Sequence, residues 1–159
     1  MLNRVYPETP LVGVGCLVID RDGRILLVKR AYPPGEGKWS IPGGHLKLGE
    51  DIVEAAVREL EEETRVKAEP RGIVNVDTLI VRDRDNKIKY HYVLIDVLMV
   101  NPKGDPEPSG DVLEVGYYTL EDSLKLDLTR SVRGLVEKII RGLIYIDRPI
   151  RHERYEYIE

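Results

Sequence analysis

The chain has 159 residues, which is enough for one domain with a substantial core and short for two. Its hydrophobic content of 42% and charged content of 33% exclude an intrinsically disordered protein, and its formal charge of −4 gives no support for binding a nucleic-acid polymer. No apolar run approaches the roughly 18–20 residues that cross a bilayer, so we expect a single domain over 1–159 that does not bind a membrane, with its core at about 10–145 and a C-terminal tail at 146–159.

The first predicted elements form a β-hairpin. Residues 12–19 are a nearly continuous β-favouring run, 20–23 have the sequence Asp-Arg-Asp-Gly that is typical of a turn, and 24–29 supply the second strand. Cys16 is the only cysteine, lies in the first strand and is expected to be a buried structural thiol. A single cysteine cannot form an internal disulfide, which favours the reducing cytoplasm as the location of the protein.

A loop and a short extended segment lead to the most clearly predicted helix. Residues 31–38 contain two prolines and two glycines, and 39–41 are expected to be extended. Asp51 and Glu54 form an Asp-x-x-Glu capping pattern at the start of the helix. Side chains at helical spacing then predict a buried stripe of Val53, Ala56, Val57, Leu60 and Thr64.

The next part of the chain predicts a second hairpin. Residues 72–81 and 88–100 are strand-like, and 83–86 form the turn between them. A loop rich in proline and glycine follows at 101–110, and a short strand-like segment at 117–120.

The last predicted element is a helix that begins after Thr129, a favourable N-cap residue. Its apolar face comprises Val132, Leu135, Val136, Ile139, Ile140 and Leu143. Because strands and helices do not alternate regularly along the chain, the sequence predicts an α+β fold with a mixed β-sheet packed between helices, an α/β/α sandwich.

Candidate chemistry is concentrated on the helix after residue 51. Glu59, Glu62 and Glu63 are spaced i, i+3 and i+4, so we expect their carboxylates to share one side of the helix, beside the buried stripe. Three carboxylates so close repel one another, and Mg²⁺, which prefers oxygen ligands, would compensate the repulsion. The alternative is a solvated acidic face. The Pro-Gly-Gly sequence at 42–44 and the adjacent Arg58 favour a phosphate site.

A family resemblance is carried by the series Gly44-x5-Glu50-x7-Arg58-Glu59-Leu60-x-Glu62-Glu63-x-Arg65-Val66. It resembles the Nudix box, G-x5-E-x7-R-E-U-x-E-E-x-G-U with U a bulky aliphatic residue, and the similarity extends over roughly residues 10 to 140. The one departure is Arg65, where the family has glycine. This position is expected to be a left-handed helix C-cap, where arginine costs about 1 kcal/mol of stability without touching the carboxylates.

The resemblance implies a Nudix fold and a role for each residue of the box. Glu59, Glu62 and Glu63 would be catalytic metal ligands, with Gly44 as a further backbone ligand. The metal would be Mg²⁺, with Mn²⁺ as an alternative. Arg58 would orient the glutamates, with Glu50 as its partner. One of the glutamates would also orient or deprotonate the attacking water.

The family often carries another acid on a loop outside the box, as a base or as a ligand. Asp111 and Glu114 are the candidates, and plain solvated loop charges are the alternative. For substrate binding, Arg30, Lys38 and His45 are candidates for contacts with phosphates.

The remaining predicted substrate contacts are aromatic residues and the turn before the helix. Trp39 and Tyr32 are candidates for stacking on a base, although Trp39 fits the core equally well. Gly43 and Gly44 form the turn that would approach the phosphates.

The resemblance implies a Nudix hydrolase, an enzyme that cleaves a diphosphate linkage in a nucleoside diphosphate joined to another moiety. The favoured reaction converts ADP-ribose to AMP and ribose 5-phosphate. A nucleoside triphosphate pyrophosphohydrolase and a non-catalytic nucleotide-binding domain are the alternatives. The expected partner is a small nucleotide, and a cytoplasmic homodimer is expected by analogy with relatives.

Overall fold

A computed structural model describes residues 3–159; Met1 and Leu2, which belong to the predicted domain, lie outside the described residues. The strands are β1 (Leu11–Ile19), β2 (Ile25–Arg30), β3 (Trp39–Ser40), β4 (Gly43–His45), β5 (Lys67–Arg82), β6 (Ile88–Lys103) and β7 (Val112–Tyr118). The helices are α1 (Ile52–Thr64), α2 (Leu120–Ser123) and α3 (Arg130–Ile140).

The strands form one mixed sheet, as predicted. Its order is β3-β2-β1-β6-β5, with β4 paired to β1 and β7 paired to β2. Strands β1 and β6 run parallel, and the other pairs are antiparallel. Strand β2 meets β1 only at the Ile19–Ile25 pair, and β4 pairs with β1 further down at residues 13–15. Strand β3 pairs with β2 and β4 pairs with β1, so residues 41–42 carry the chain from one to the other. The predicted turn is therefore wrong at Gly43 and Gly44, which are extended in β4 because they pair with Gly15 and Val14.

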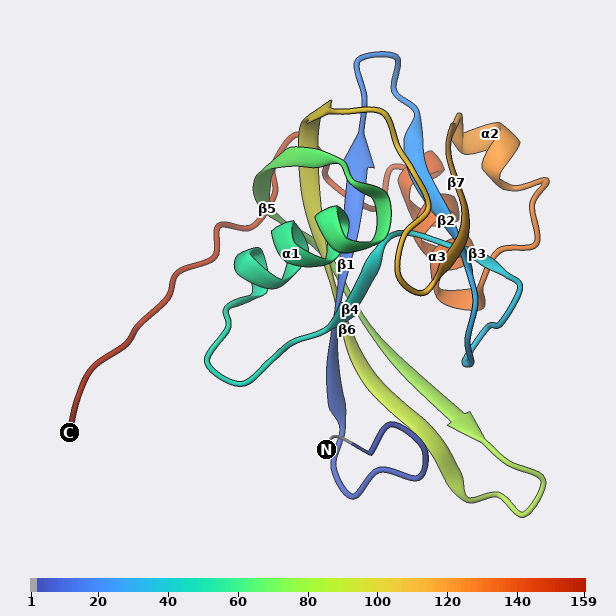
Figure 1. Cartoon of the computed structure of the whole chain (residues 1–159), viewed down its shortest axis with the longest axis vertical. Coiled ribbons are helices and arrows are strands. Elements are labelled where there is room, and N and C mark those ends of the chain that lie inside the picture. The colour runs from blue at the N-terminus through green and yellow to red at the C-terminus, as the bar shows by residue number, and fades with distance from the viewer. Residues whose placement is uncertain (1–2) are drawn as a thin grey trace.

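Helices α1 and α3 cover opposite faces of the sheet, so the predicted α/β/α sandwich is confirmed (Figure 1). Alternate residues of β1 point to the two faces. Val14, Cys16 and Val18 are buried against α1, whereas Leu17 packs in the cluster under α3. Cys16 is the buried structural thiol that was expected, and its thiol donates to the carbonyl of Ala56 at 3.2 Å.

Helix α1 begins as its capping pattern predicts. The Asp51 side chain accepts from the amide of Glu54, and the Glu54 side chain accepts from the amide of Asp51. The predicted buried stripe is wrong at Val57, which is 39% exposed, whereas Ala55 is fully buried. The stripe is rotated because the helix packs through its small alanines, and this rotation turns the Glu59 and Glu63 side of the helix toward the sheet.

The end of α1 is the left-handed cap expected from the sequence. Arg65 has φ +64° and ψ +6°, and its amide donates to the carbonyl of Glu61 at 3.0 Å. The helix therefore keeps the geometry that favours glycine, although arginine occupies the position.

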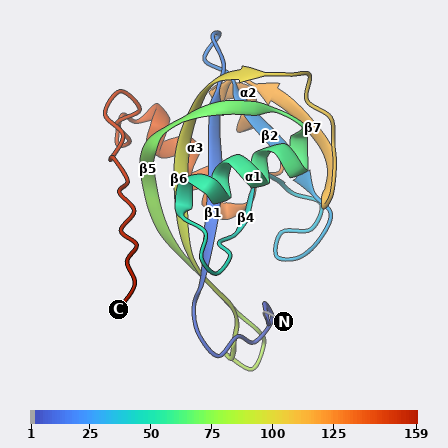
Figure 2. The ribbon, with the colours of Figure 1, turned by 60° about the vertical axis from the view of Figure 1, so that its left-hand side comes forward.

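Strands β5 and β6 are longer than predicted, and they form a hairpin that extends beyond the helices together with the N-terminal segment (Figure 2). The first residues of β5, 67–71, are mostly exposed and include three charged side chains, so they lack the apolar pattern of a strand. Bulges interrupt the β5–β6 pairing at several points, and this irregularity further weakens the alternation.

The C-terminal third differs from the prediction in its details. Thr129 caps α3 as expected, but the predicted apolar face is wrong at Ile140 and Leu143, which are 46% and 56% exposed, and α3 ends at Ile140. The tail crosses the outer strand β5, where Ile150 exchanges two backbone hydrogen bonds with Ile73, both 2.8 Å. Within residues 3–159, the helices all fall short of the length and apolarity of a membrane span.

Candidate active site

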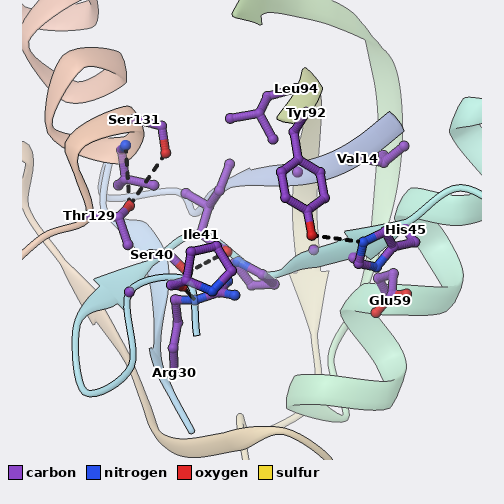
Figure 3. Close-up of a pocket in the computed structure, with 18 of the residues that line it drawn as sticks. Val14, Arg30, Ser40, Ile41, His45, Glu59, Tyr92, Leu94, Thr129 and Ser131 are labelled. Carbon is purple, nitrogen blue, oxygen red and sulfur yellow. Dashed lines mark hydrogen bonds between the residues drawn. The ribbon is translucent and has the colours of Figure 1, made fainter. Parts of the chain in front are cut away.

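One cavity of about 770 Å³ extends from α1 to the start of α3. Figure 3 shows Glu59 on α1 at one side of this cavity and Thr129 and Ser131 at the other, with Tyr92 and Leu94 of β6 between them. Carboxylates therefore stand at one end of a cleft that is large enough for a nucleotide-sized ligand.

Glu63 is the most buried of the box glutamates. Its Oε2 accepts a hydrogen bond from the amide of Gly43 at 3.2 Å. Burial, with further contributions from Glu59 and Asp111, raises the pKa of Glu63 to about 8, against the lowering effects of the Gly43 amide and of Arg30. A cation placed here would offset both the burial and the like charge, so Glu63 behaves as a group that lacks a positive partner.

Glu59 lies directly against strand β4 at Gly44. A Cβ atom at Gly44 would overlap the Glu59 carboxylate, so any larger residue at this position would displace that side chain. The carboxylate side chain is 13% exposed. The backbone of Gly44 and the carboxylate of Glu59 therefore line the same small space, as expected for two members of one ligand set.

Arg58 organises the box residues. Its Nε and Nη2 lie 2.6 and 2.9 Å from the two oxygens of Glu50, and Nη2 also donates to the carbonyl of His45 at 3.1 Å. Its Nη1 reaches Glu59 at 2.7 Å and Glu62 at 3.3 Å. The hydrogen bonds from Arg58 lower the pKa of Glu50, and those to Glu50 and Glu59 raise the pKa of Arg58. The predicted Arg58–Glu50 partnership is present in the structure.

The three glutamates do not form a closed metal cage. In the described part of the chain, no group of three or more His, Cys, Asp or Glu side chains is arranged to hold a metal. Glu62 is 55% exposed at its side chain and points to Arg58, whereas Glu59 and Glu63 point to strand β4. The donor set is nevertheless of the kind that hard divalent cations take: carboxylate oxygens with a backbone carbonyl beside them.

The two candidate loop acids have different surroundings. Asp111 lines the cavity and acts on Glu63 through its charge. Glu114 lies on β7, forms a 2.9 Å ion pair with Lys29, and does not line the cavity. The structure therefore brings Asp111 to the box glutamates and leaves Glu114 outside.

Arg30 and Lys38 both line the cavity, but each already has a partner. The Nε of Arg30 donates to the carbonyl of Pro34 at 2.7 Å, which leaves its other nitrogens available. Lys38 forms a 2.8 Å ion pair with Asp127. Arg30 is thus the better placed of the two for a phosphate.

His45 meets the cavity as a neutral ring. Its Nε2 lies 3.1 Å from the hydroxyl of Tyr92. Burial, with smaller effects from Arg4 and Arg30, lowers the pKa of His45 to about 4. His45 therefore offers a hydrogen bond rather than a positive charge.

The two aromatic candidates for stacking are separated by the fold. Trp39 is 9% exposed, packs edge-on against Tyr118 with ring centroids 5.4 Å apart, and is absent from the cavity wall because it fills the core under α3. Tyr32 lines the cavity and is 61% exposed, so it lies at the rim.

Some cavity residues were not identified from the sequence. Asp96 on β6 is 8% exposed and lines the cavity, and so does Asp77 on β5. The available signal was a lone carboxylate within the otherwise apolar strand from residue 90 to residue 100. Such a residue is costly to bury, which by itself marks a candidate functional position.

The resemblance to the Nudix family is supported by a family model that matches most of the chain. Residues 9–139 match the model described as the NUDIX domain. The match covers every residue of the box and both candidate loop acids.

Individual relatives have activities that their names record. The chain is 30% identical over 109 residues to an ADP-ribose pyrophosphatase of Methanocaldococcus jannaschii; the match covers 69% of this chain and 62% of that protein, so it spans less than two thirds of the relative's length. It is 34% identical over 132 residues to phosphatase NudJ of Shigella boydii, covering 83% and 82% of the two chains. A MutT NUDIX hydrolase of Burkholderia pseudomallei has a TM-score of 0.72 at 34% identity, over 83% of this chain and 99% of that one.

Proposed function

The chain belongs to the Nudix family of hydrolases, and from that membership we propose that its cavity binds an ADP-ribose-like nucleoside diphosphate derivative and that the box glutamates catalyse cleavage of its diphosphate. The observation that carries the proposal is the position of Glu59 and Glu63 at one end of a cavity of about 770 Å³. The archaeal relative named as an ADP-ribose pyrophosphatase supports the choice of compound.

We propose that Glu59, Glu62 and Glu63, with the backbone of Gly44, hold Mg²⁺ or Mn²⁺. A divalent metal bound there would polarise the phosphoryl oxygens and acidify the attacking water. For Glu62 to take part, its carboxylate would turn away from Arg58, to which it is only loosely bound at 3.3 Å.

The other residues of the chain supply position and proton transfer. Arg58 fixes the carboxylate of Glu59, and Arg30 faces the phosphates. Asp111 is the proposed base. It would take a proton from water as the water oxygen attacks one phosphorus, and the anhydride bond from that phosphorus to the bridging oxygen would break. With ADP-ribose, the two products are AMP and ribose 5-phosphate.

A second candidate is a nucleoside triphosphate pyrophosphohydrolase, which the same box glutamates at the end of the same cavity would serve. The two candidates differ in the compound that gives the highest kcat/KM. A third reading, a domain that binds nucleotide without catalysis, is disfavoured by the intact set of Glu59, Glu62 and Glu63.

The test is a panel of ADP-ribose, NADH, GDP-mannose, diadenosine polyphosphates and (oxo-)dNTPs with Mg²⁺, with the products separated by chromatography. The proposal expects ADP-ribose to be the best compound. A triphosphate preferred over every diphosphate-linked compound contradicts it. The variant Glu62→Gln, at an exposed position, serves as the catalytic control, and unchanged turnover in that variant contradicts the assignment of the site.

A further inference from the structure

The β6 wall of the cavity carries a carboxylate that the proposed reaction does not use. Asp96 is 8% exposed and its Oδ2 accepts a hydrogen bond from the Nδ2 of Asn75 at 2.9 Å. The Oδ1 receives no hydrogen bond from any residue between 3 and 159. Among the described residues the fully buried side-chain atom without a partner is His152 Nε2, so the Oδ1 of Asp96 keeps some exposed surface, and that surface opens into the cavity that Asp96 lines. A ligand that fills the cavity would bury this oxygen and must therefore supply its donor.

A hydrogen-bond network fixes the orientation of this carboxylate. The Nδ2 of Asn75 also donates to Asp77 at 2.8 Å, and its Oδ1 accepts from the Nζ of Lys138 at 2.6 Å. Lysine can only donate, so the Asn75 amide oxygen must face Lys138 and the amide nitrogen must face Asp96. The Oδ2 of Asp96 is therefore directed at Asn75, and Oδ1 is left for a ligand.

The position of Asp96 relative to the glutamates indicates the length of the ligand. Gly43, whose amide contacts Glu63, pairs with Gly15 of β1, and Gly15 pairs with Asp96 of β6. Two strand spacings, about 10 Å, separate the backbones of Gly43 and Asp96. The Oδ1 of Asp96 reaches back over Gly15, where a Cβ atom would lie 2.5 Å from it, so the group that meets Oδ1 lies nearer to the glutamates than the backbone spacing, within the nucleoside that follows the phosphate.

The surroundings of Asp96 favour a base over a sugar. Ile41, Leu94 and Leu135 line the same cavity, and a Cβ atom at Gly15 would lie 2.5 Å from the Oδ1 of Asp96 and 2.7 Å from the Cδ1 of Ile41. The acceptor is thus set directly beside an aliphatic wall. A flat base that presents its 6-amino group to Oδ1 suits such a site, and a 6-oxo group at the same place would set two acceptors against each other. A ribose would bury hydroxyl groups against the aliphatic side chains.

We propose that the Oδ1 of Asp96, positioned by Asn75, accepts a hydrogen bond from the exocyclic amine of the nucleobase and selects 6-amino purines over 6-oxo purines. This inference rests on the proposed function, which supplies a nucleoside diphosphate derivative to the cavity. It adds a residue that determines specificity and lies on a different strand from the catalytic box.

The test is the substitution Asp96→Asn, which inverts the polarity of the contact. Asn75 still requires an acceptor, so the oxygen of the new amide faces Asn75 and its NH₂ group faces the cavity. A donor then stands where the acceptor was. The kcat/KM of wild type is expected to favour ADP-ribose over its hypoxanthine counterpart by roughly tenfold or more, and Asp96→Asn is expected to reverse that preference.

The matched control is Asp77→Asn, which removes a carboxylate from the same network but leaves the acceptor at Asp96. This variant is expected to keep the base preference of wild type. Circular dichroism and the unfolding temperature verify that both variants fold. Equilibrium binding of AMP and inosine monophosphate to each variant gives the same comparison without turnover.

The outcomes separate this inference from the proposed function. A base preference that is unchanged in Asp96→Asn, in turnover and in binding, overturns the assignment of Asp96. Loss of discrimination against 2′- or 3′-deoxyribose analogues, with the base preference intact, also overturns it, because the carboxylate then binds the ribose. If wild type hydrolyses neither ADP-ribose nor its hypoxanthine counterpart but binds AMP over inosine monophosphate in an Asp96-dependent way, the proposed substrate fails and the Asp96 assignment stands.

Discussion

The guanidinium of Arg58 holds both carboxylate oxygens of Glu50, at 2.6 and 2.9 Å, and uses its remaining nitrogen to contact Glu59 at 2.7 Å. Glu50 lies in the loop before α1, and Glu59 lies in the middle of the helix. One planar side chain thus connects the loop to the carboxylate that faces Gly44. The orientation of Glu59 therefore depends on Arg58, and the orientation of Arg58 depends on Glu50.

Arg58→Lys is expected to lower metal-dependent turnover by roughly 10- to 100-fold, because a lysine keeps the charge but cannot make the planar set of contacts. The concentration of Mg²⁺ needed for half-maximal activity should rise with it. Arg154→Lys is the control. Arg154 belongs to the C-terminal tail, forms a 2.8 Å ion pair with Glu54 of the same helix α1, and does not line the cavity. Equal losses in both variants would assign the effect to helix stability.

Gly44→Ala is expected to lose most activity while the protein remains folded. The added methyl group would occupy the space of the Glu59 carboxylate and displace it. The loss should appear in kcat, measured at saturating Mg²⁺ and substrate. Gly134→Ala in α3 meets no heavy atom within 4 Å and should leave kcat unchanged. Full activity of Gly44→Ala would show that Glu59 is not needed where the structure places it.

Asp111→Asn is expected to reduce kcat by roughly 10² or more, the usual contribution of a general base, with little change in KM. Glu114→Gln is the paired variant. Its side chain is 57% exposed and bound to Lys29, so kcat should change little. The reverse order of effects would move the role of base from Asp111 to Glu114.

Arg65→Gly is expected to stabilise the protein by about 1 kcal/mol, because glycine adopts the left-handed conformation without a Cβ penalty. Urea unfolding measures the change, and turnover should stay the same. Asn86→Gly, at φ +63° in the β5–β6 turn, should gain less, since asparagine tolerates this conformation. A loss of turnover in Arg65→Gly would show that the arginine serves the site.

Asp96→Asn should also change the pH dependence of stability. Burial raises the pKa of Asp96 from 3.8 to about 6, against the lowering effect of the Asn75 hydrogen bond. Between these values the folded protein holds a proton that the unfolded chain releases, so the wild type loses stability as pH rises, by about 3 kcal/mol at most.

The variant lacks this proton. The difference in free energy of unfolding, Asp96→Asn minus wild type, should therefore be near zero at pH 4. It should increase until about pH 6 and then remain constant to pH 8. Urea unfolding at fixed ionic strength measures the difference. A difference that does not vary with pH would show that Asp96 titrates normally in the folded state.

Features fixed by neighbouring residues were predictable from the sequence. The Asp51–Glu54 capping box, the left-handed Arg65 and the Thr129 cap each depend on contacts within one helical turn. The box glutamates were predictable for a related reason, since helical spacing determines which of them lie together.

Features fixed by distant residues were not predictable. The orientation of the Asp96 carboxylate depends on Asn75, which lies 21 residues away in the sequence. Asn75 is oriented in turn by Lys138 of helix α3. Val57 fits the helical repeat, yet the sheet selects the alanine side of α1 and leaves Val57 exposed. Trp39 illustrates the same limit: no local pattern distinguishes a tryptophan under α3 from one on the cavity wall.

The bridge between Ile150 and Ile73 has a consequence for behaviour in concentrated solution. Strand β5 is the outermost strand on its side of the sheet, and such a strand offers unpaired amides and carbonyls to any other extended chain. The tail uses both backbone groups of Ile73, and the carbonyl oxygen of Ile150 lies where a side chain at Gly72 would stand. The C-terminal segment thus covers part of the exposed edge of β5. Without this segment, two molecules would be more prone to aggregate by pairing their β5 strands.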